Sequence, residues 1–361
     1  KKYPDAKQYR DYRKMFAEIS DRIDTVNVGT PDHMHAAISL TAMLKGKHVY
    51  CQKPLTHDVW EARKMADVAR ARKIVTQMGI QMHSSVPYRL AVKVIQGGAI
   101  GKVKEVHSWS FKKWGFDGPR PAGEDPVPEN LDWDLWLGTA PDRPFKKKIY
   151  HPGNWRMWTD FGCGTMGDMS IHILDPIAGA LGLTQPRTIL SESEPPPPES
   201  FSTRNVVKYV FPGTATTVDP FPLTWYDGDA LPSPQEKAWP IDKLPDQGSM
   251  FVGEKGFMLL PHVAKPQLLP ADSFKGYVFP PVEGDNHWHR WVNACKGEGS
   301  TSANFDYAGP LTEFVLLGVL ANRVPGKLLK WTAADLKLEG SDEAAARLKR
   351  VYRKGWEVEG V

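Results

Sequence analysis

Short apolar runs alternate with amphipathic stretches in the first part of this chain. Three runs have the length and apolar content of buried strands, at residues 25–29, 48–51 and 74–79. Amphipathic helices are predicted within residues 3–20, 33–45 and 58–73. Strands that alternate with helices predict a parallel sheet with crossover helices, and such sheets bind ligands beyond the carboxyl ends of their strands.

The later part of the chain has a different order of elements. A helix at about 88–97 leads into a half-buried strand predicted at 103–110. Further strands are predicted at about 205–211 and 214–219 and in a hairpin at 248–260, and helices at 162–181, 287–299, 310–323 and 341–354. Strands that follow one another in this way predict an open antiparallel or mixed sheet rather than a second doubly wound unit.

We therefore predict an α/β fold with two domains. Residues 1–87 form a partial doubly wound parallel sheet, and residues 88–361 form an α+β domain with a large open, mostly antiparallel sheet and a C-terminal helical tail. At 361 residues and 41% hydrophobic, the chain is long enough for each domain to bury its own core.

Composition limits the classes of function. The net charge is +4, and basic residues are interleaved with acidic ones, so nucleic acid is a poor choice of partner. No apolar run has the roughly 18 residues that a membrane span needs. Three cysteines, far apart and odd in number, argue against a disulfide framework. The compartment, cytoplasmic or periplasmic, stays open, because the first residue is Lys and a targeting segment, if one exists, would lie before it.

The second predicted strand ends in Gln52-Lys53-Pro54. A lysine at a strand end is solvated and idle in most proteins. Lys53, however, stands at the carboxyl end of a parallel strand, and a proline fixes the backbone after it. The neighbouring strand ends in Thr30-Pro31, so we expect these residues and Lys53 to line one crevice.

These motifs resemble a known family. Thr30-Pro31-Asp32-His33-Met34-His35, Gly46-Lys47-His48-Val49 and Gln52-Lys53-Pro54 are similar to those of the Gfo/Idh/MocA family of nicotinamide-dependent sugar and cyclitol oxidoreductases. The family usually has Glu-Lys-Pro where this chain has the neutral Gln52. The similarity runs over essentially the whole chain. The family's first two strands, which carry the glycine-rich turn for the cofactor pyrophosphate and an acidic residue for the ribose, are missing from this sequence.

Asp168 and His172 are four residues apart in a predicted helix, so both lie on one face. They can act as one acid-base unit in which the carboxylate fixes the tautomer of the imidazole. They also fit a structural interpretation, in which Asp168 interacts with the positive end of the helix dipole and His172 is buried and only fills space in the core. The resemblance implies that Lys53, Asp168 and His172 are the catalytic set, and we expect all three to meet between the domains.

The resemblance also implies a nicotinamide cofactor, NAD or NADP, and a small-molecule carbohydrate substrate. Cofactor contacts are assigned to Asn27, Thr30, Pro31, His35, Gln52, Lys53 and Gln81. Substrate contacts are assigned to Tyr88, Arg89, Trp155, Arg156 and Asp175. Each of these substrate assignments has a structural alternative.

Two further motifs are set aside. Residues 162–167 match G-x-G-x-x-G, but no apolar strand precedes them, so we expect these glycines to let a helix N-terminus approach the substrate. The pairs His33/His35 and His287/His289 fall at predicted helix starts, where alternate residues diverge, and no third ligand has the usual spacing. No metal is expected.

The favoured function is hydride transfer between the nicotinamide and a secondary hydroxyl of a sugar, cyclitol or sugar derivative. His172 takes the hydroxyl proton, Asp168 supports it, and Lys53 polarises the oxygen. Two alternatives stay open. One is a redox-neutral glycosidase or lyase that acts through a transient keto-sugar, and the other is a non-catalytic carbohydrate-binding relic.

Two expectations concern edges and assembly. Without the family's first strands, the strand at 25–28 becomes an unpaired edge, and we expect dinucleotide binding far weaker than in an N-terminally extended form. The second sheet carries apolar residues on more than one side: Val103, Trp109, Phe111, Val207, Tyr209 and Phe211. Because members of the family pair through this face, we expect a homo-oligomer, a dimer or a tetramer.

Overall fold

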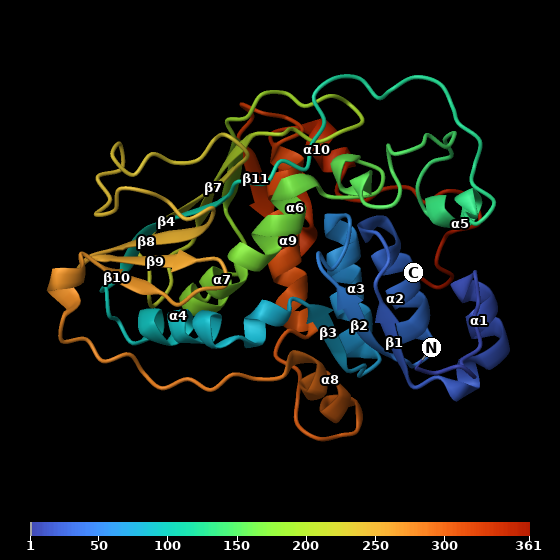
Figure 1. Cartoon of the computed structure of the whole chain (residues 1–361), viewed down its shortest axis with the longest axis horizontal. Helices are drawn as coiled ribbons and strands as arrows, with labels where there is room; N and C mark the ends of the chain where they lie inside the picture. Colours follow the sequence, from blue (N-terminus) through green and yellow to red (C-terminus); the bar gives the residue numbers. More distant parts are fainter. Residues whose placement is uncertain (1) are drawn as a thin grey trace.

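The computed structural model describes residues 2–361 and contains two sheets (Figure 1). The first sheet is parallel, in the order β1-β2-β3, with β1 at Thr25–Val28, β2 at His48–Gln52 and β3 at Thr76–Gly79. Its helices are α1 (Tyr12–Ile19), α2 (His35–Leu44) and α3 (Val59–Ala71). The predicted α/β fold is confirmed.

The second sheet has nine strands in the order β10-β9-β8-β4-β7-β6-β5-β11-β12. Every neighbouring pair is antiparallel except β4 and β7. The strands are β4 (Val103–Ser110), β5 (Thr188–Ser191), β6 (Asn205–Phe211), β7 (Phe221–Asp227), β8 (Gln247–Gly253), β9 (Phe257–Pro261), β10 (Gln267–Leu269), β11 (Leu329–Thr332) and β12 (Lys337–Glu339).

Helices α6 and α9 lie between the two sheets, where α9 packs on α3, α6 and β5 (Figure 1). The helices of this part are α4 (Val86–Gln96), α5 (Trp133–Leu137), α6 (Gly164–Ile173), α7 (Asp175–Leu181), α8 (His287–Cys295), α9 (Phe305–Ala321) and α10 (Asp342–Ala346). One apolar core therefore runs from the parallel sheet through α9 to the second sheet.

Side-chain caps set where several helices begin. Asp58 accepts a hydrogen bond from the backbone N–H of Glu61, and the Glu61 side chain accepts from the backbone of Asp58, so α3 starts with a capping box. Asn304 caps α9, which therefore begins five residues before the predicted start and contains Pro310. Asp11 caps α1 in the same way.

Two predicted elements were wrong. The helix predicted at 341–354 ends at Ala346, because the chain beyond it turns onto α3, where Arg350 pairs with Glu61 at 2.9 Å. The strand predicted at 214–219 is a turn. Its threonine hydroxyls bond to one another and to the backbone, as when Thr217 Oγ1 accepts from the Thr214 N–H at 2.8 Å.

The apolar strand residues of the second sheet are covered within the chain. Val207, Tyr209 and Phe211 share the face that packs on α9, whereas Trp109 lies in a separate cluster against Trp239, from the loop between β7 and β8. Phe111 is 46% exposed. The homo-oligomer stays a prediction, because the structure supplies cover for most of the residues on which it was based.

The two edges of the parallel sheet differ. Within residues 2–361, β1 pairs with β2 alone, which confirms the expected open edge at Thr25–Val28. Beyond β3, the segment before α9 takes the place of a neighbour, since the Met78 N–H donates to the carbonyl of Ala303 at 2.8 Å. The C-terminal part of the chain thus packs on both sheets.

No helix within residues 2–361 has the length and apolar character to cross a membrane. All three cysteines are free thiols: Cys51, Cys163 and Cys295.

Candidate active site

Lys53 follows β2 directly and reaches α6. Its Nζ lies 2.7 Å from Asp168 Oδ2 and 3.4 Å from the Asp168 carbonyl oxygen. The side chain of Lys53 is 17% exposed and that of Asp168 is 2% exposed. Two of the three predicted catalytic residues, 115 positions apart in sequence, therefore meet where the parallel sheet faces α6.

Asp168 holds a second cation. Arg156, from the turn before α6, donates from Nε to Asp168 Oδ1 at 2.9 Å. Burial opposes the ionised form of Asp168, but Lys53 and Arg156 outweigh burial and hold the pKa of the carboxyl below its ordinary value. Asp168 is thus a carboxylate with both oxygens occupied.

His172 is not oriented by Asp168, which corrects the expectation of an Asp–His unit. The two residues lie one helical turn apart, yet the Asp168 oxygens face Lys53 and Arg156, and His172 Nδ1 has no hydrogen-bond partner among residues 2–361. The ring faces that of His262, with centroids 6.0 Å apart. Burial and Lys53 lower the pKa of His172 to about 3, so the imidazole is neutral at neutral pH.

A cleft of about 500 Å³ opens at Lys53, along the carboxyl ends of β1 and β2. Six residues assigned to cofactor or substrate line it: Thr30, Pro31, Gln52, Lys53, Trp155 and Arg156. Five further lining residues were not predicted: Gly29, Asp32, Trp136, His151 and Pro152. His172 is not part of this lining, and its ring lies near that of His262, the residue directly after β9.

Three residues assigned to the cofactor do not line the cleft. Asn27 is an exposed residue of β1, and Gln81 is exposed beyond β3. His35 is buried at the start of α2, with Nε2 2.8 Å from the Thr30 carbonyl and Nδ1 2.8 Å from the Pro54 carbonyl. His35 therefore ties the two loops that carry Thr30 and Lys53 instead of reaching a ligand.

Three residues assigned to the substrate lie elsewhere. Tyr88, Arg89 and Asp175 line a separate cavity of about 290 Å³ between α4 and α7. Asp175 is buried and is 2.9 Å from His83 Nδ1, and it accepts from the Tyr307 hydroxyl at 2.6 Å. Its partners lie far apart in sequence, His83 before α4 and Tyr307 in α9, so Asp175 ties these segments to α7 rather than binding a ligand in the Lys53 cleft.

Asp32 is the most informative residue that the sequence did not single out. Its side chain is 1% exposed, it lines the cleft, and Oδ2 has no hydrogen-bond partner within the described residues. Burial and the neighbouring Asp168 carboxylate raise the pKa of Asp32 to about 8. A carboxyl directly after Thr30-Pro31 was a usable signal, but it looked like a helix cap.

Aromatic residues form one wall of the cleft. Trp136 stacks on Trp133 with centroids 4.9 Å apart, and the guanidinium of Arg156 lies 4.2 Å from the ring of Trp155. The place of Trp136 beside Lys53 depends on a loop whose path the sequence does not show.

Gln52 sits at the centre of the parallel sheet's carboxyl end. A Cβ atom on Gly79 would lie 2.6 Å from Gln52 Oε1, so the glycine at the end of β3 leaves room for this amide. The Gln52 Cγ is 3.9 Å from the corresponding position of Gly29, at the end of β1. The Gln52 amide, a neutral hydrogen-bond donor and acceptor, thus lies near the ends of all three parallel strands, beside Lys53.

The cleft fits the nicotinamide end of a dinucleotide. It offers a hydroxyl, an amide and an ammonium along the carboxyl ends of parallel strands. Among the described residues, none of the three parallel strands is followed by a glycine-rich turn, and residues 162–167 open α6 after a turn rather than after a strand. The rejection of those glycines as a dinucleotide fingerprint is consistent with this placement.

Two profiles of one oxidoreductase family match the chain. One, described as an NAD-binding Rossmann fold, matches residues 1–80, and the other, described as a C-terminal alpha/beta domain, matches residues 86–216. The chain belongs to the Gfo/Idh/MocA oxidoreductase family. The family that the motifs at 30–35 and 52–54 indicated is confirmed, and its cofactor-binding domain is of the NAD-binding type.

Several curated relatives carry names of sugar or cyclitol enzymes. The chain is 28% identical over 153 residues to a levoglucosan dehydrogenase of Pseudarthrobacter phenanthrenivorans, covering 42% of this chain and 32% of that protein. It is 37% identical over 93 residues to an inositol 2-dehydrogenase of Rubrobacter xylanophilus, covering 25% and 26%. The chain therefore spans about a third or less of the length of these relatives.

Solved structures share the fold over most of the chain. A WlbA dehydrogenase of Chromobacterium violaceum, in complex with NADH and UDP-GlcNAcA, matches with a TM-score of 0.62 at 15% identity and covers 91% of this chain and 83% of that one. An inositol dehydrogenase homologue of Azotobacter vinelandii, complexed with NADH and myo-inositol, matches with a TM-score of 0.57 at 15% identity, covering 90% and 83%. At these identities the likeness shows the fold.

Proposed function

We propose that this protein is a nicotinamide-dependent oxidoreductase that acts on a secondary hydroxyl of a sugar, cyclitol or sugar derivative. The observation that carries the proposal is the buried ion pair between Lys53 and Asp168 at the mouth of a cleft beyond the parallel strands. Matches to sugar and cyclitol dehydrogenases support the substrate class.

Lys53 is the electrophilic group. Asp168 holds its ammonium beside the cleft at 2.7 Å. A hydroxyl oxygen bound next to Nζ is stabilised as it gains alkoxide character, and the low exposure of the pair strengthens this interaction. Arg156 shares the negative charge of Asp168, so Lys53 is only partly neutralised by its partner.

His172 is the proton acceptor. Its ring is neutral at neutral pH because burial and Lys53 disfavour the cation. With no hydrogen bond at Nδ1 from the described chain, the imidazole is not committed to a structural partner. A substrate that bridges Lys53 and His172 places its hydroxyl proton within reach of an imidazole nitrogen, and proton removal by His172 accompanies the loss of the hydride.

The walls of the cleft position the substrate and the cofactor. The faces of Trp136 and Trp155 suit the apolar faces of a sugar ring. Thr30 and Gln52, at the strand ends, offer a hydroxyl and an amide to a carboxamide. A bound nicotinamide supplies the hydride acceptor in this arrangement.

A panel assay tests the proposal. The chain is incubated with NAD or NADP and with levoglucosan, myo-inositol, xylose or glucose, and formation of reduced cofactor is followed by its near-ultraviolet absorbance. We expect net cofactor reduction with at least one polyol and its loss in Lys53→Met, with Lys45→Met, an exposed lysine before β2, as the matched control. Conversion of a glycoside without net cofactor turnover favours the redox-neutral alternative and contradicts the proposal.

A further inference from the structure

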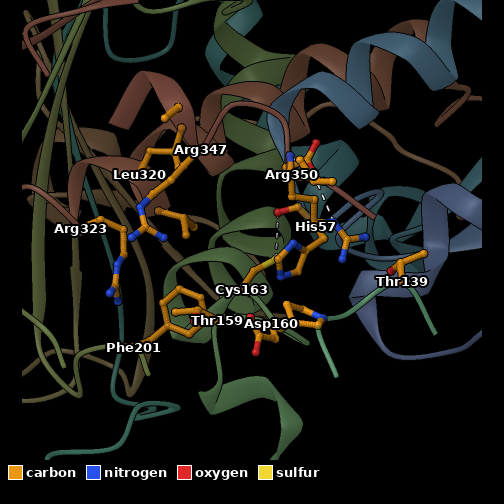
Figure 2. Close-up of a pocket in the computed structure, with 16 residues that line it drawn as sticks. His57, Thr139, Thr159, Asp160, Cys163, Phe201, Leu320, Arg323, Arg347 and Arg350 are labelled. Atoms are coloured by element: carbon orange, nitrogen blue, oxygen red, sulfur yellow. Dashed lines mark hydrogen bonds and ion pairs between the residues drawn. The ribbon is translucent and has the colours of Figure 1, made fainter. Parts of the chain in front are cut away.

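A cavity of about 230 Å³ lies between the end of α9, the tail after α10 and the loop that follows Lys53. Figure 2 shows Arg323 and Arg347 on one side of this cavity and His57 and Arg350 on the other. None of the residues assigned to the cofactor or the substrate lines it, so the cavity is separate from the proposed active site.

The acidic residues of the cavity already have cationic partners. Asp58 is 3.4 Å from the Nε of Arg350, and Asp160 forms an ion pair with Arg143. Burial, reinforced by Arg350, holds the pKa of His57 well below its usual range, so this ring adds no charge. The charge that remains is that of the two arginines on the α9 side.

Arg323 carries a charge that no carboxylate within residues 2–361 contacts. Its Nη atoms donate to backbone carbonyls, those of Ser200 at 2.6 Å and of Pro197 and Pro198 at 3.1 and 2.8 Å. Its Nε has no hydrogen-bond partner among the described residues. Burial and the neighbouring Arg347 lower the pKa of Arg323 to about 10, which shows that the surroundings disfavour its cation.

Arg347 has little compensation of its own. The nearest carboxylate oxygen, from Glu343, is 3.6 Å from its Nη2, and both side chains of this pair are about half exposed. Arg323 and Arg347 thus have between them one weakly placed carboxylate, that of Glu343, which does not line the cavity. An oxyanion between them would relieve the repulsion, because guanidinium groups bind carboxylate and phosphate through paired, charge-assisted hydrogen bonds.

The rest of the lining indicates an organic ligand. Phe201 and Leu320 lie on the same side of the cavity as Arg323 (Figure 2), and Val319 adds further apolar lining. The volume of about 230 Å³ also exceeds what a free inorganic ion fills, since one water takes about 30 Å³ of liquid. We propose that this cavity binds a small organic molecule through a carboxylate or phosphate group, which Arg323 and Arg347 hold while its carbon body packs on Phe201, Val319 and Leu320.

Thermal unfolding and calorimetric titration with defined probes test this site. Glycerol 3-phosphate, glycerate and inorganic phosphate are each added at constant ionic strength set with chloride, and glycerol is the uncharged probe. We expect a saturable rise of about 2 °C or more in the unfolding midpoint with glycerol 3-phosphate or glycerate and none with glycerol. The organic probe that gives the larger rise in the unfolding midpoint shows whether the site prefers a phosphate ester or a carboxylate. If inorganic phosphate binds as tightly as glycerol 3-phosphate and glycerate, the proposal that the ligand is organic is overturned.

Variants separate this site from the Lys53 cleft. Arg347→Gln removes a half-exposed side chain, so the fold is retained, and we expect binding of the organic probe to weaken about tenfold. Arg187→Gln, at an exposed pair with Asp219, is the matched control and should bind as the unchanged protein does. Arg323→Gln, which also loses hydrogen bonds to three backbone carbonyls, is a second variant and should weaken binding as well. Equal affinity of Arg347→Gln and Arg187→Gln, or no saturable effect of any anion, overturns the proposal.

Discussion

The charges at the Lys53 cleft do not cancel. Lys53 and Arg156 are cations and Asp168 is a carboxylate, whereas Asp32 is neutral at neutral pH because burial and Asp168 raise its pKa to about 8. The cleft therefore keeps one net positive charge, which favours a developing alkoxide. Ionisation of Asp32 would remove that excess, so its protonation is part of how the site works.

Asp32→Asn should change how stability depends on pH. A carboxyl whose pKa rises from 3.8 to about 8 on folding binds its proton more tightly in the folded state, so stability falls as the pH rises from about 4 to about 8. The amide has no such proton, and we expect the variant to gain more than about 1 kcal/mol relative to the unchanged protein between pH 5 and 8. Urea unfolding across this range measures it. A constant difference between the two proteins would mean that Asp32 is ionised.

Much of the candidate site could be predicted from the residue types at the motif positions. Lys53 was identifiable because its position follows from the strand that precedes it. The ion pair of Asp168 with Arg156 was not, because helical spacing shows which residues share a face but not which of them meets a cation from another element. Trp136 and His151 could not be placed either, since they reach the cleft through a long loop with little periodicity.

At the scale of elements, ion pairs hold the tail after α10 against the start of α3, beside the parallel sheet. Arg350 bridges Glu61 at 2.9 Å and Asp58 at 3.4 Å, both at the first turn of α3. Both side chains are buried, and burial and the neighbouring Glu61 raise the pKa of Asp58, so Arg350 is the cation on which this acidic pair depends. The sequence predicted a helix here because helical propensity is local, whereas this ion pair joins positions 289 residues apart.

Replacing Arg350, the cation of this tail, should destabilise the protein strongly. Arg350→Met leaves buried carboxylates without their partner, and we expect a loss of about 3–5 kcal/mol in the free energy of unfolding. Arg347→Met, three residues earlier and half exposed, is the control and should cost less than about 1 kcal/mol. Urea denaturation of both variants measures this. Equal losses would show that the tail contributes through apolar packing instead.

The pair His83–Asp175 joins the segment after β3 to α7 in a pH-dependent way. Burial lowers the pKa of His83, but the Asp175 carboxylate at 2.9 Å outweighs it, and the net pKa lies above the ordinary 6.5. The stabilisation is therefore complete below pH 6.5 and is lost as the pH rises through the folded-state value. His83→Gln should lose this slope in unfolding experiments between pH 6 and 8. A slope identical to that of the unchanged protein would contradict the pairing.

At the scale of the whole molecule, the hydrophobic pattern predicted the type of each sheet better than it predicted which strands are neighbours. The parallel order β1-β2-β3 follows from alternating strands and helices, and the sequence showed it. The nine-stranded sheet was predicted only as a class, because β5, β10, β11 and β12 have three or four residues each and β11 joins β5 from 140 positions away in the chain. Short strands have weak periodicity, and such pairings depend on the assembled core.

Assembly is a prediction at the same scale. The face of the second sheet that carries Trp109 is covered in part by the loop with Trp239, and Phe111, directly after β4, and Leu231, in the same loop, are exposed. We expect a homo-oligomer through this face, with a mass at least twice 40.4 kDa by light scattering at micromolar concentration. Phe111→Lys should reduce that mass if this face forms the interface, and a monomer in the unchanged protein would contradict the expectation.

The central claim is that Lys53, held by Asp168, promotes hydride transfer. The most direct measurement is the single-turnover rate of cofactor reduction, with the active polyol from the panel, in the unchanged protein, Lys53→Met and the control Lys45→Met. We predict that Lys53→Met lowers this rate by about 10²–10³-fold while cofactor affinity changes less than about threefold, and that Lys45→Met has no effect. A rate in Lys53→Met within about threefold of the unchanged protein would contradict the account.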